Sequence, residues 1–336
     1  MTVHGIAYVE FHCEDAHKYA AALRADYGFT VAEPAPAAGP VRPGLTRLTA
    51  RQGGITVVLC SAADPGDPVS AFVGRHGDGV AVLALSCEDT ADALARTEAA
   101  VRRGAVRIDA TTVAGYGDLA LRFVGRDDPL LAGFEPDPSA LLQEVDHVAV
   151  CVPAGELAAA VRYSREALGF SAIFSEYLEI GAQAMNSEVV QSPGGGVTLT
   201  LLEPDAAREP GQIDGFLDAH GGTGVQHLAF RTDDIAGAVR TLSGRGVTFL
   251  TTPGSYYDAL PERLGGTSIA AGVLRELNLL VDQDHGGQLF QIFTRSTHPR
   301  NTLFLELIER RGAGTFGSAN IKALYEAVER ERADTA

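Results

Sequence analysis

The chain has 336 residues, 46% of them hydrophobic, and a formal net charge of −16 at pH 7. This length predicts two domains or one large one, and the hydrophobic share is that of a folded protein. The negative charge argues against nucleic acid as a partner, because phosphate binding requires clustered Lys and Arg. We also expect no membrane partner, since no apolar run approaches the roughly 18–20 residues of a transmembrane helix.

The N-terminal residues and the cysteines both indicate a cytoplasmic protein. Residues 1–5 do not begin the basic segment and apolar stretch that mark a signal peptide. The cysteines form no CxxC pair, and their spacing matches neither a zinc site nor a disulfide framework. An activated thiol has no supporting sequence around it. We expect reduced, mostly buried thiols at Cys13, Cys60, Cys87 and Cys151.

A degenerate internal repeat organises the chain. Segment 5–11 (GIAYVEF) precedes an Ala-rich stretch that ends in Tyr-Gly-Phe at 27–29. Segment 145–150 (VDHVAV) precedes a similar stretch that ends in Leu-Gly-Phe at 168–170. Each copy predicts a strand, a helix and a glycine turn into the next strand.

A second pair of segments repeats in the same order. Residues 77–84 (GDGVAVLA) match residues 222–229 (GTGVQHLA), and helical stretches follow at 89–103 and 233–245. We therefore expect an α/β (α+β) fold in which each of two domains consists of paired βαβββ modules. The second half also has extra strands and a C-terminal helix.

The Pro-rich segment 128–140 predicts the domain boundary. We expect an N-terminal domain over residues 1–130 that is structural and holds no metal, and a catalytic domain over residues 144–336. The final segment, 318–332, carries one apolar stripe at helical spacing. This stripe fits either a helix packed on the domain or a lid over a pocket.

Three consecutive glycines at 194–196 could suggest a phosphate-binding loop, but the Lys-Ser/Thr that completes such a loop does not follow them. They lie between two strand-like runs at 188–190 and 197–199. We therefore predict a hairpin turn at this place.

The repeat allows the two halves to be compared at equivalent strand positions. The first half has Tyr8 and Val82 there, whereas the second half has His147 and His227. A single His in a strand is more often a core residue than a metal ligand. Two at matching places in paired repeats favour a shared ligand role, so we expect the second half to carry the chemistry.

A carboxylate in a later apolar strand completes a candidate metal site. Glu306 lies in the run 302–308 (TLFLELI), and a buried carboxylate without a partner costs several kcal/mol. A nearby cation would remove this cost. The alternative is a buried ion pair with Arg310 or Arg311. Glu309 falls on the opposite face of the strand, where we expect solvent.

Two histidines and one carboxylate form the facial triad that is typical of non-haem Fe(II) oxygenases, with about three coordination positions open. Zinc would accept the same ligands, but the chain has no HExxH helix and no obvious hydrolytic base. We expect the remaining histidines to lie at the surface or in loops: His4, His12, His17, His76, His220, His285 and His298.

Several segments of the second half, with Asn320, resemble the 4-hydroxyphenylpyruvate dioxygenase family, an α-keto-acid-dependent group within the vicinal-oxygen-chelate superfamily. These segments are 181–187 (GAQAMNS), 224–227 (GVQH), 284–293 (DHGGQLFQIF) and 312–317 (GAGTFG). The resemblance covers nearly the whole chain. It implies a glyoxalase-like half-barrel in each domain and a C-terminal lid helix.

The resemblance also implies a cofactor, a substrate and a reaction. The family pattern makes His147, His227 and Glu306 the ligands of Fe(II), which binds the keto acid 4-hydroxyphenylpyruvate and O2. Oxidative decarboxylation releases CO2. One branch of the family hydroxylates the ring and forms homogentisate. The other hydroxylates the benzylic carbon and forms 4-hydroxymandelate, a precursor of hydroxyphenylglycine in peptide antibiotics.

Three residues depart from the homogentisate-forming pattern. Thr200 replaces its usual Pro, Leu202 replaces an Asn that faces the pocket, and Ile321 replaces a Phe beside Asn320. A smaller wall and the loss of a polar group would let the substrate turn its CH2 towards the metal. We therefore expect the mandelate-forming branch, with neutral drift within a homogentisate-forming enzyme as the alternative.

The resemblance assigns further residues to the substrate pocket, although each of them also fits a structural role. The polar ones are Ser187, Gln212, Gln226 and Gln291, and the aromatic ones are Phe293, Phe304 and Phe316. A module that binds a small aromatic ligand without catalysis is the rival from another functional class. The assembly that we expect, if there is one, is a homodimer.

Overall fold

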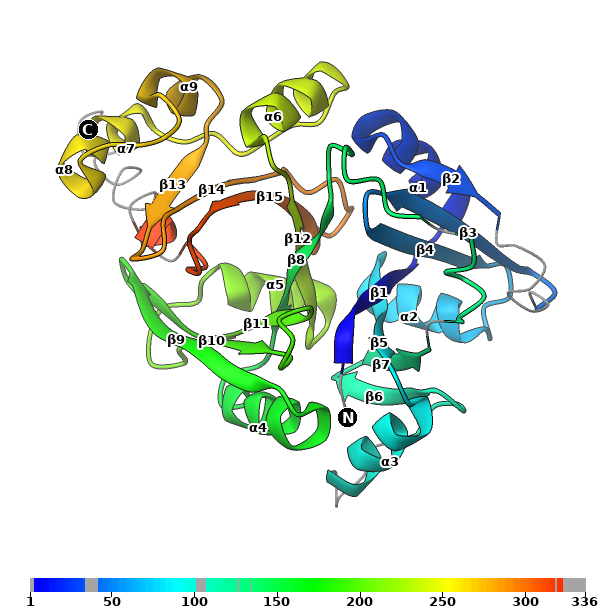
Figure 1. Cartoon of the computed structure of the whole chain (residues 1–336). Coiled ribbons are helices and arrows are strands. Elements are labelled where there is room, and N and C mark those ends of the chain that lie inside the picture. The colour runs from blue at the N-terminus through cyan, green and yellow to red at the C-terminus, as the bar shows by residue number, and fades with distance from the viewer. Residues whose placement is uncertain are drawn as a thin grey trace.

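The computed structural model describes residues 3–33, 42–100, 107–125, 127–133, 135–317 and 319–322. Its strands form two mixed sheets, one from each half of the chain, which curve side by side with helices around them (Figure 1). This is the two-domain α/β architecture that the internal repeat predicts, with the half-barrels that the resemblance implies. None of the described helices has the length and apolarity that crossing a membrane would require.

The N-terminal sheet has the strand order β2-β3-β4-β1-β5-β7-β6. Its elements are β1 (Val3–His12), α1 (Ala16–Ala22), η1 (Leu23–Tyr27), β2 (Thr30–Ala32), β3 (Leu45–Gln52), β4 (Ile55–Ala62), α2 (Pro68–His76), β5 (Gly79–Cys87), α3 (Thr90–Ala100), β6 (Thr112–Tyr116) and β7 (Leu119–Val124).

The C-terminal sheet has the strand order β13-β14-β15-β12-β8-β11-β10-β9. Its elements are β8 (Glu144–Cys151), α4 (Leu157–Leu168), β9 (Ser171–Ile180), β10 (Gln183–Gln191), β11 (Thr198–Pro204), α5 (Gln212–His220), β12 (Gly224–Arg231), α6 (Ile235–Gly244), α7 (Gly254–Asp258), α8 (Leu260–Leu264), α9 (Ala271–Glu276), β13 (Leu280–Gln283), β14 (Gln288–Phe293) and β15 (Phe304–Arg311).

The modules follow the repeat, with one difference. In the C-terminal sheet two βαβββ modules meet where β8 and β12 pair antiparallel. In the N-terminal sheet β1 and β5 pair in the same way. There the second module has the strands β5, β6 and β7 among the described residues, one fewer than expected. Residues 319–322 begin a helical turn, and the rest of the predicted helix 318–332 lies outside the described residues.

Glycines end the first helical segment of each half, as the sequence predicts. Gly28 (φ 80°) follows η1, and Gly169 (φ 71°) follows α4. This left-handed conformation is accessible to glycine without the steric cost of a Cβ atom. Residues 194–196 join β10 to β11, which pair antiparallel, so the prediction of a hairpin is confirmed.

One continuous apolar core joins the two domains. Phe29 of the first half and Phe230 of the second lie with ring centroids 6.4 Å apart. The hydroxyl groups of Tyr116 and Ser164 are 2.7 Å apart across the same interface. The four cysteines are free and buried, as predicted. Burial of apolar area is the main stabilising term in folding, so this shared core favours a fixed arrangement of the two half-barrels.

Four histidines contradict the expectation of surface or loop positions. His12 is half-buried in β1. His76, His220 and His298 are all buried. His76 Nε2 lies 2.8 Å from Asp118, its Nδ1 lies 2.8 Å from the carbonyl oxygen of His220, and the two imidazoles stack at 4.4 Å. Because these contacts join α2 to α5, the pair connects the two domains.

The buried histidines predict loss of stability in acid. Burial lowers the pKa of His220 and of His298 to about 4, whereas an unperturbed His titrates near pH 6.5. Between these values the unfolded chain binds more protons than the folded one. The free energy of unfolding should therefore decrease as the pH falls from about 6.5 to about 4.

Denaturant unfolding at about pH 7 and about pH 5 measures this decrease. We expect the His298→Gln variant to lose less stability than the wild type between the two conditions. The exposed His17 provides the matched control, since His17→Gln should leave the pH dependence unchanged. An identical pH dependence in wild type and His298→Gln would contradict this account.

Candidate metal centre

Three adjacent strands at the middle of the C-terminal sheet bring the predicted ligands together. Ala229 of β12 pairs with both His147 of β8 and Glu306 of β15, and His227 lies two residues before it. Since side chains alternate along a strand, all three potential ligands project from the same face of the sheet. Two histidines that lie 80 residues apart in the sequence therefore belong to a single cluster.

The cluster has the composition and dimensions of a metal site. One ligand atom from each of His147, His227 and Glu306 lies within 4.8 Å of the others. Glu306 Oε2 is 3.4 Å from His147 Nε2 and 3.5 Å from His227 Nε2. Two imidazole nitrogens and one carboxylate oxygen suit a divalent transition metal. The residues present therefore fit the ion that the resemblance implies.

The site attracts positive charge. Burial alone would lower the pKa of His147, but its hydrogen bonds to Asp146 and Glu306 outweigh burial and raise the pKa to about 9. Burial and the neighbouring His147 hold the pKa of His227 well below its usual value. Without a metal one imidazole thus carries a proton beside the carboxylate. A bound divalent cation would replace that proton.

Asp146 and Arg310 orient the first ligand. His147 Nδ1 donates to Asp146 Oδ1 at 2.9 Å, and Arg310 forms two hydrogen bonds to the same carboxylate at 2.7 and 2.8 Å. Despite burial, these bonds hold the pKa of Asp146 well below its usual range. With Nδ1 engaged in this way, Nε2 of His147 is presented to the metal.

The ion-pair alternative for Glu306 does not describe this arrangement. Arg310 pairs with Asp146, and Arg311 pairs with Glu309 at 2.6 Å. The expectation that Glu309 meets solvent is wrong. Its carboxylate is buried and accepts a hydrogen bond from the backbone N–H of Ile235, at the start of α6.

The three predicted aromatic residues surround the ligands. The ring of Phe304 stacks on His227 at 5.0 Å, and Phe293 meets the same imidazole edge-on at 6.2 Å. Phe316 approaches His147 edge-on at 5.8 Å. These rings form an apolar wall beside the two histidines.

The residues that distinguish the two family branches form a second cluster on the same face. Leu202 and Ile321 belong to one apolar cluster around Ala149 of β8. Thr200 pairs with Ala149 in the strand ladder. Its Oγ1 atom is buried and has no hydrogen-bond partner among the described residues. Ser187 lies opposite Leu202 on β10 and is buried.

The remaining predicted residues have mixed positions. Gln226 Oε1 lies 3.2 Å from His227 Nδ1, so Gln226 contacts a potential ligand directly. Asn320 donates to Gln291 Oε1 at 3.3 Å and accepts from Tyr256 at 2.7 Å. Gln212 is the first residue of α5. Among the described residues, no hydrogen bond joins its side chain to the centre.

Sequence reasoning missed Asp146 and Tyr256, and it considered Arg310 only as a partner of Glu306. A signal for Asp146 and Arg310 exists. Asp146 directly precedes His147, and Arg310 lies four residues after Glu306, on the same strand face. Tyr256 lies in α7, and its proximity to Asn320 depends on the tertiary structure.

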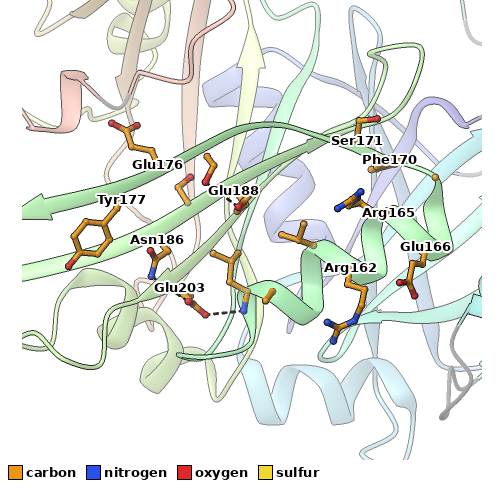
Figure 2. A pocket seen from close by; sticks show the side chains of 16 residues that line it. Arg162, Arg165, Glu166, Phe170, Ser171, Glu176, Tyr177, Asn186, Glu188 and Glu203 are labelled. Atoms are coloured by element: carbon orange, nitrogen blue, oxygen red, sulfur yellow. Dashed lines mark hydrogen bonds between the residues drawn. The ribbon is translucent and has the colours of Figure 1, made fainter.

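A large open hollow of about 980 Å³ lies elsewhere, between α4 and the hairpin of β9 and β10 (Figure 2). Charged side chains from both sides line it, among them Arg162, Glu176 and Glu188. Glu203, which also lines it, accepts hydrogen bonds from the backbone of Gly155 and Leu157 at the start of α4. None of the three potential ligands lines this hollow.

Comparison with known proteins gives a consistent result. Residues 144–262 match the model of the Glyoxalase/Bleomycin resistance protein/Dioxygenase superfamily. The 4-hydroxyphenylpyruvate dioxygenase of Yarrowia lipolytica is 33% identical over 84% of this chain and 80% of its own length. That of Danio rerio is 32% identical over 84% and 79%.

Among solved structures, a triple mutant of 4-hydroxymandelate synthase from Streptomyces coelicolor is similar over nearly the entire chain. The sequence identity is 43%, the TM-score is 0.87, and the alignment covers 99% of this chain and 100% of the other.

Removing the charge of Asp146 tests its role towards His147. We expect Asp146→Asn to weaken Fe(II) affinity about 10–100-fold, because the imidazole loses the carboxylate that orients it and raises its basicity. Anaerobic calorimetric titration with Fe(II) measures the affinity. Glu309→Gln is the matched control. It also neutralises a buried carboxylate paired with an arginine, but it touches no ligand. Equal Fe(II) affinity in wild type and Asp146→Asn would refute the role.

Proposed function

Since the chain belongs to the 4-hydroxyphenylpyruvate dioxygenase family, we propose that it forms 4-hydroxymandelate and CO2 from 4-hydroxyphenylpyruvate and O2 with the help of Fe(II). One oxygen atom enters the carboxylate left by decarboxylation, and the other enters the benzylic hydroxyl group. The observation that carries the proposal is the convergence of His147, His227 and Glu306 on one sheet face. The similarity to 4-hydroxymandelate synthase supports it.

The donor set favours iron over zinc. Two histidines and one carboxylate leave about three adjacent positions open, enough for a bidentate keto acid and for O2. Bound iron would supply the oxidative chemistry. The described residues around the ligands are mainly aromatic and include no free carboxylate that could act as a hydrolytic base.

The chain's own residues would bind and orient the substrate. Phe293, Phe304 and Phe316 would hold the substrate ring and exclude water, which limits side reactions of activated oxygen. The unpartnered hydroxyl of Thr200 is available for a polar group of the substrate. Thr200 lies two strands from His227 across β8, a separation of about 10 Å, which suits an arylpyruvate that spans the two clusters.

Leu202 and Ile321 would decide which carbon is oxidised. They pack in one apolar cluster, so the wall facing the ring offers it no hydrogen bond at these positions. Without a polar group at these two positions the ring can shift, and the CH2 carbon then lies nearer the metal than the ring carbon. On this proposal the product would serve hydroxyphenylglycine synthesis.

The second candidate is formation of homogentisate. It is favoured by the names of the relatives from Yarrowia lipolytica and Danio rerio, which are 4-hydroxyphenylpyruvate dioxygenases. The ligands and the substrate are the same in both reactions, so only the pocket wall separates the two candidates.

Product identification separates the candidates. After aerobic incubation with 4-hydroxyphenylpyruvate and Fe(II), we expect 4-hydroxymandelate as the main product in the mass spectrum, and homogentisate as the main product would defeat the proposal. We expect Ile321→Phe to move part of the product towards ring hydroxylation, because the phenylalanine side chain supplies an aromatic wall that Ile321 lacks. Ile321→Leu, of equal volume, is the control. An unchanged product ratio in Ile321→Phe would contradict the role of the wall.

Substitution of a ligand distinguishes an enzyme from a module that only binds an aromatic ligand. In the absence of O2, Fe(II) and the keto acid should give a weak visible charge-transfer band in the wild type. We expect His227→Ala to lose both this band and all turnover, whereas His17→Gln should retain both. A wild type that binds the keto acid tightly without such a band would favour the binding module.

A further inference from the structure

The strand registers allow the two domains to be compared residue by residue. In the C-terminal sheet, His147 and Glu306 pair with the same alanine of β12. In the N-terminal sheet, Tyr8 and Arg122 pair in the same way with Ala84 of β5. Tyr8 therefore occupies the place of His147, and Arg122 occupies the place of the carboxylate Glu306. The charge at this place is inverted between the domains.

Arg122 is held by three hydrogen bonds, which engage only part of the donors of its guanidinium group. Its Nη1 donates to Glu10 Oε2 at 2.6 Å and to the hydroxyl of Tyr8 at 3.2 Å, and its Nε donates to Thr112 Oγ1 at 3.1 Å. His12 lies 3.1 Å from the other oxygen of Glu10. Among the described residues, nothing accepts a hydrogen bond from Nη2. The guanidinium therefore has one edge fixed by the protein and one amine available to a ligand.

A second arginine belongs to the same concave face. Arg47 pairs with Cys60 in the ladder of β3 and β4, as Ser187 pairs with Leu202 in that of β10 and β11. Cys60 and Leu202 in turn pair with the equivalent ends of β1 and β8. Arg47 therefore stands where the catalytic half has Ser187, a residue assigned to its substrate pocket.

A cavity of about 720 Å³ opens over these residues. The guanidinium groups of Arg122, Arg47, Arg42 and Arg75 line it, and so do the carboxylates of Glu10, Asp109 and Asp118. Arg42 pairs with Asp67, Arg75 with Asp118 and Arg122 with Glu10, and Arg47 also has an interaction within the protein. Such a concentration of guanidinium groups stands out in a chain of net charge −16.

Small side chains make room in this cavity. Thr112 lies opposite Arg122 as Phe293 lies opposite Glu306, so a threonine takes the place of an aromatic wall residue. The remaining surface includes an apolar part formed by Val69, Phe72 and Ile108. A volume of several hundred Å³ with an apolar wall and a few converging polar groups is typical of small-molecule sites.

We propose that this cavity binds a small carboxylate with an apolar body. The carboxylate accepts hydrogen bonds from Arg122 and Arg47, and the body packs against Phe72 and Ile108. Guanidinium groups match the planar, two-oxygen geometry of a carboxylate, and partial burial strengthens the interaction. In the C-terminal domain the metal would supply the positive charge for an acid ligand. Here arginines supply the positive charge. The site shares no residue with the metal centre.

Calorimetric titration of the full-length protein with phenylacetate tests the proposal. We expect the wild type to bind it and Arg47→Met to weaken binding at this site about tenfold or more, as loss of a charged hydrogen-bond partner does. A second variant changes an exposed residue at the rim, so that the packing of the protein interior is not altered. Ile108 is 56% exposed at the cavity rim, and Ile108→Glu should weaken binding by repulsion without affecting folding.

Leu250→Glu is the matched control, since Leu250 is 42% exposed and belongs to the other domain. It introduces the same charge and should leave phenylacetate affinity unchanged. The proposal is overturned if the wild type binds no phenylacetate, or if folded Arg47→Met and Ile108→Glu both bind it as the wild type does. Turnover of the keto acid is a separate measurement and does not enter this outcome.

Discussion

A buried negative charge in the middle of the C-terminal sheet sets the requirements for the surrounding structure. Asp146 and Glu306 are both carboxylates in one cluster, and Arg310 compensates only the first of them. The second must find a cation, because an unpaired buried charge is costly. The raised pKa of His147 shows this demand being met by a proton. A divalent metal held by both imidazoles and the carboxylate would meet it better.

The N-terminal sheet has the same topology at its centre. There the buried carboxylate is neutralised by side chains of the protein itself. Arg122 stands in the place of Glu306 and pairs with Glu10, which His12 also contacts. Desolvation opposes ionisation of Glu10, but these partners lower the pKa of its carboxyl to about 2. The carboxylate of Glu10 thus has cationic partners within the protein. Two sheets with equivalent strand registers can therefore differ completely in chemistry through a few side chains on one face.

Much of this could be predicted from local sequence, because strand alternation, helix periodicity and glycine turns depend on neighbouring residues. The repeat placed His147 and His227 on equivalent strands, and the burial of Glu306 suggested the third ligand. Contacts between distant elements escaped prediction. Glu309 does lie on the opposite face from Glu306, but α6 covers that face and takes up its carboxylate. The burial of His76 and His220 depends on the contact between two helices of different domains, which no local pattern contains.

The charge network of the metal centre also extends into the pocket wall. Arg310, besides holding Asp146, donates to the carbonyl oxygen of Thr315 at 2.6 Å. Asp284 accepts hydrogen bonds from the backbone N–H groups of Gly314 and Thr315 at 2.7 and 2.9 Å. These bonds fix the segment that carries Phe316 against His147. A single half-buried arginine, Arg310, thus orients a ligand on one side and the aromatic wall on the other. Metal affinity and substrate position are therefore coupled through the same few hydrogen bonds.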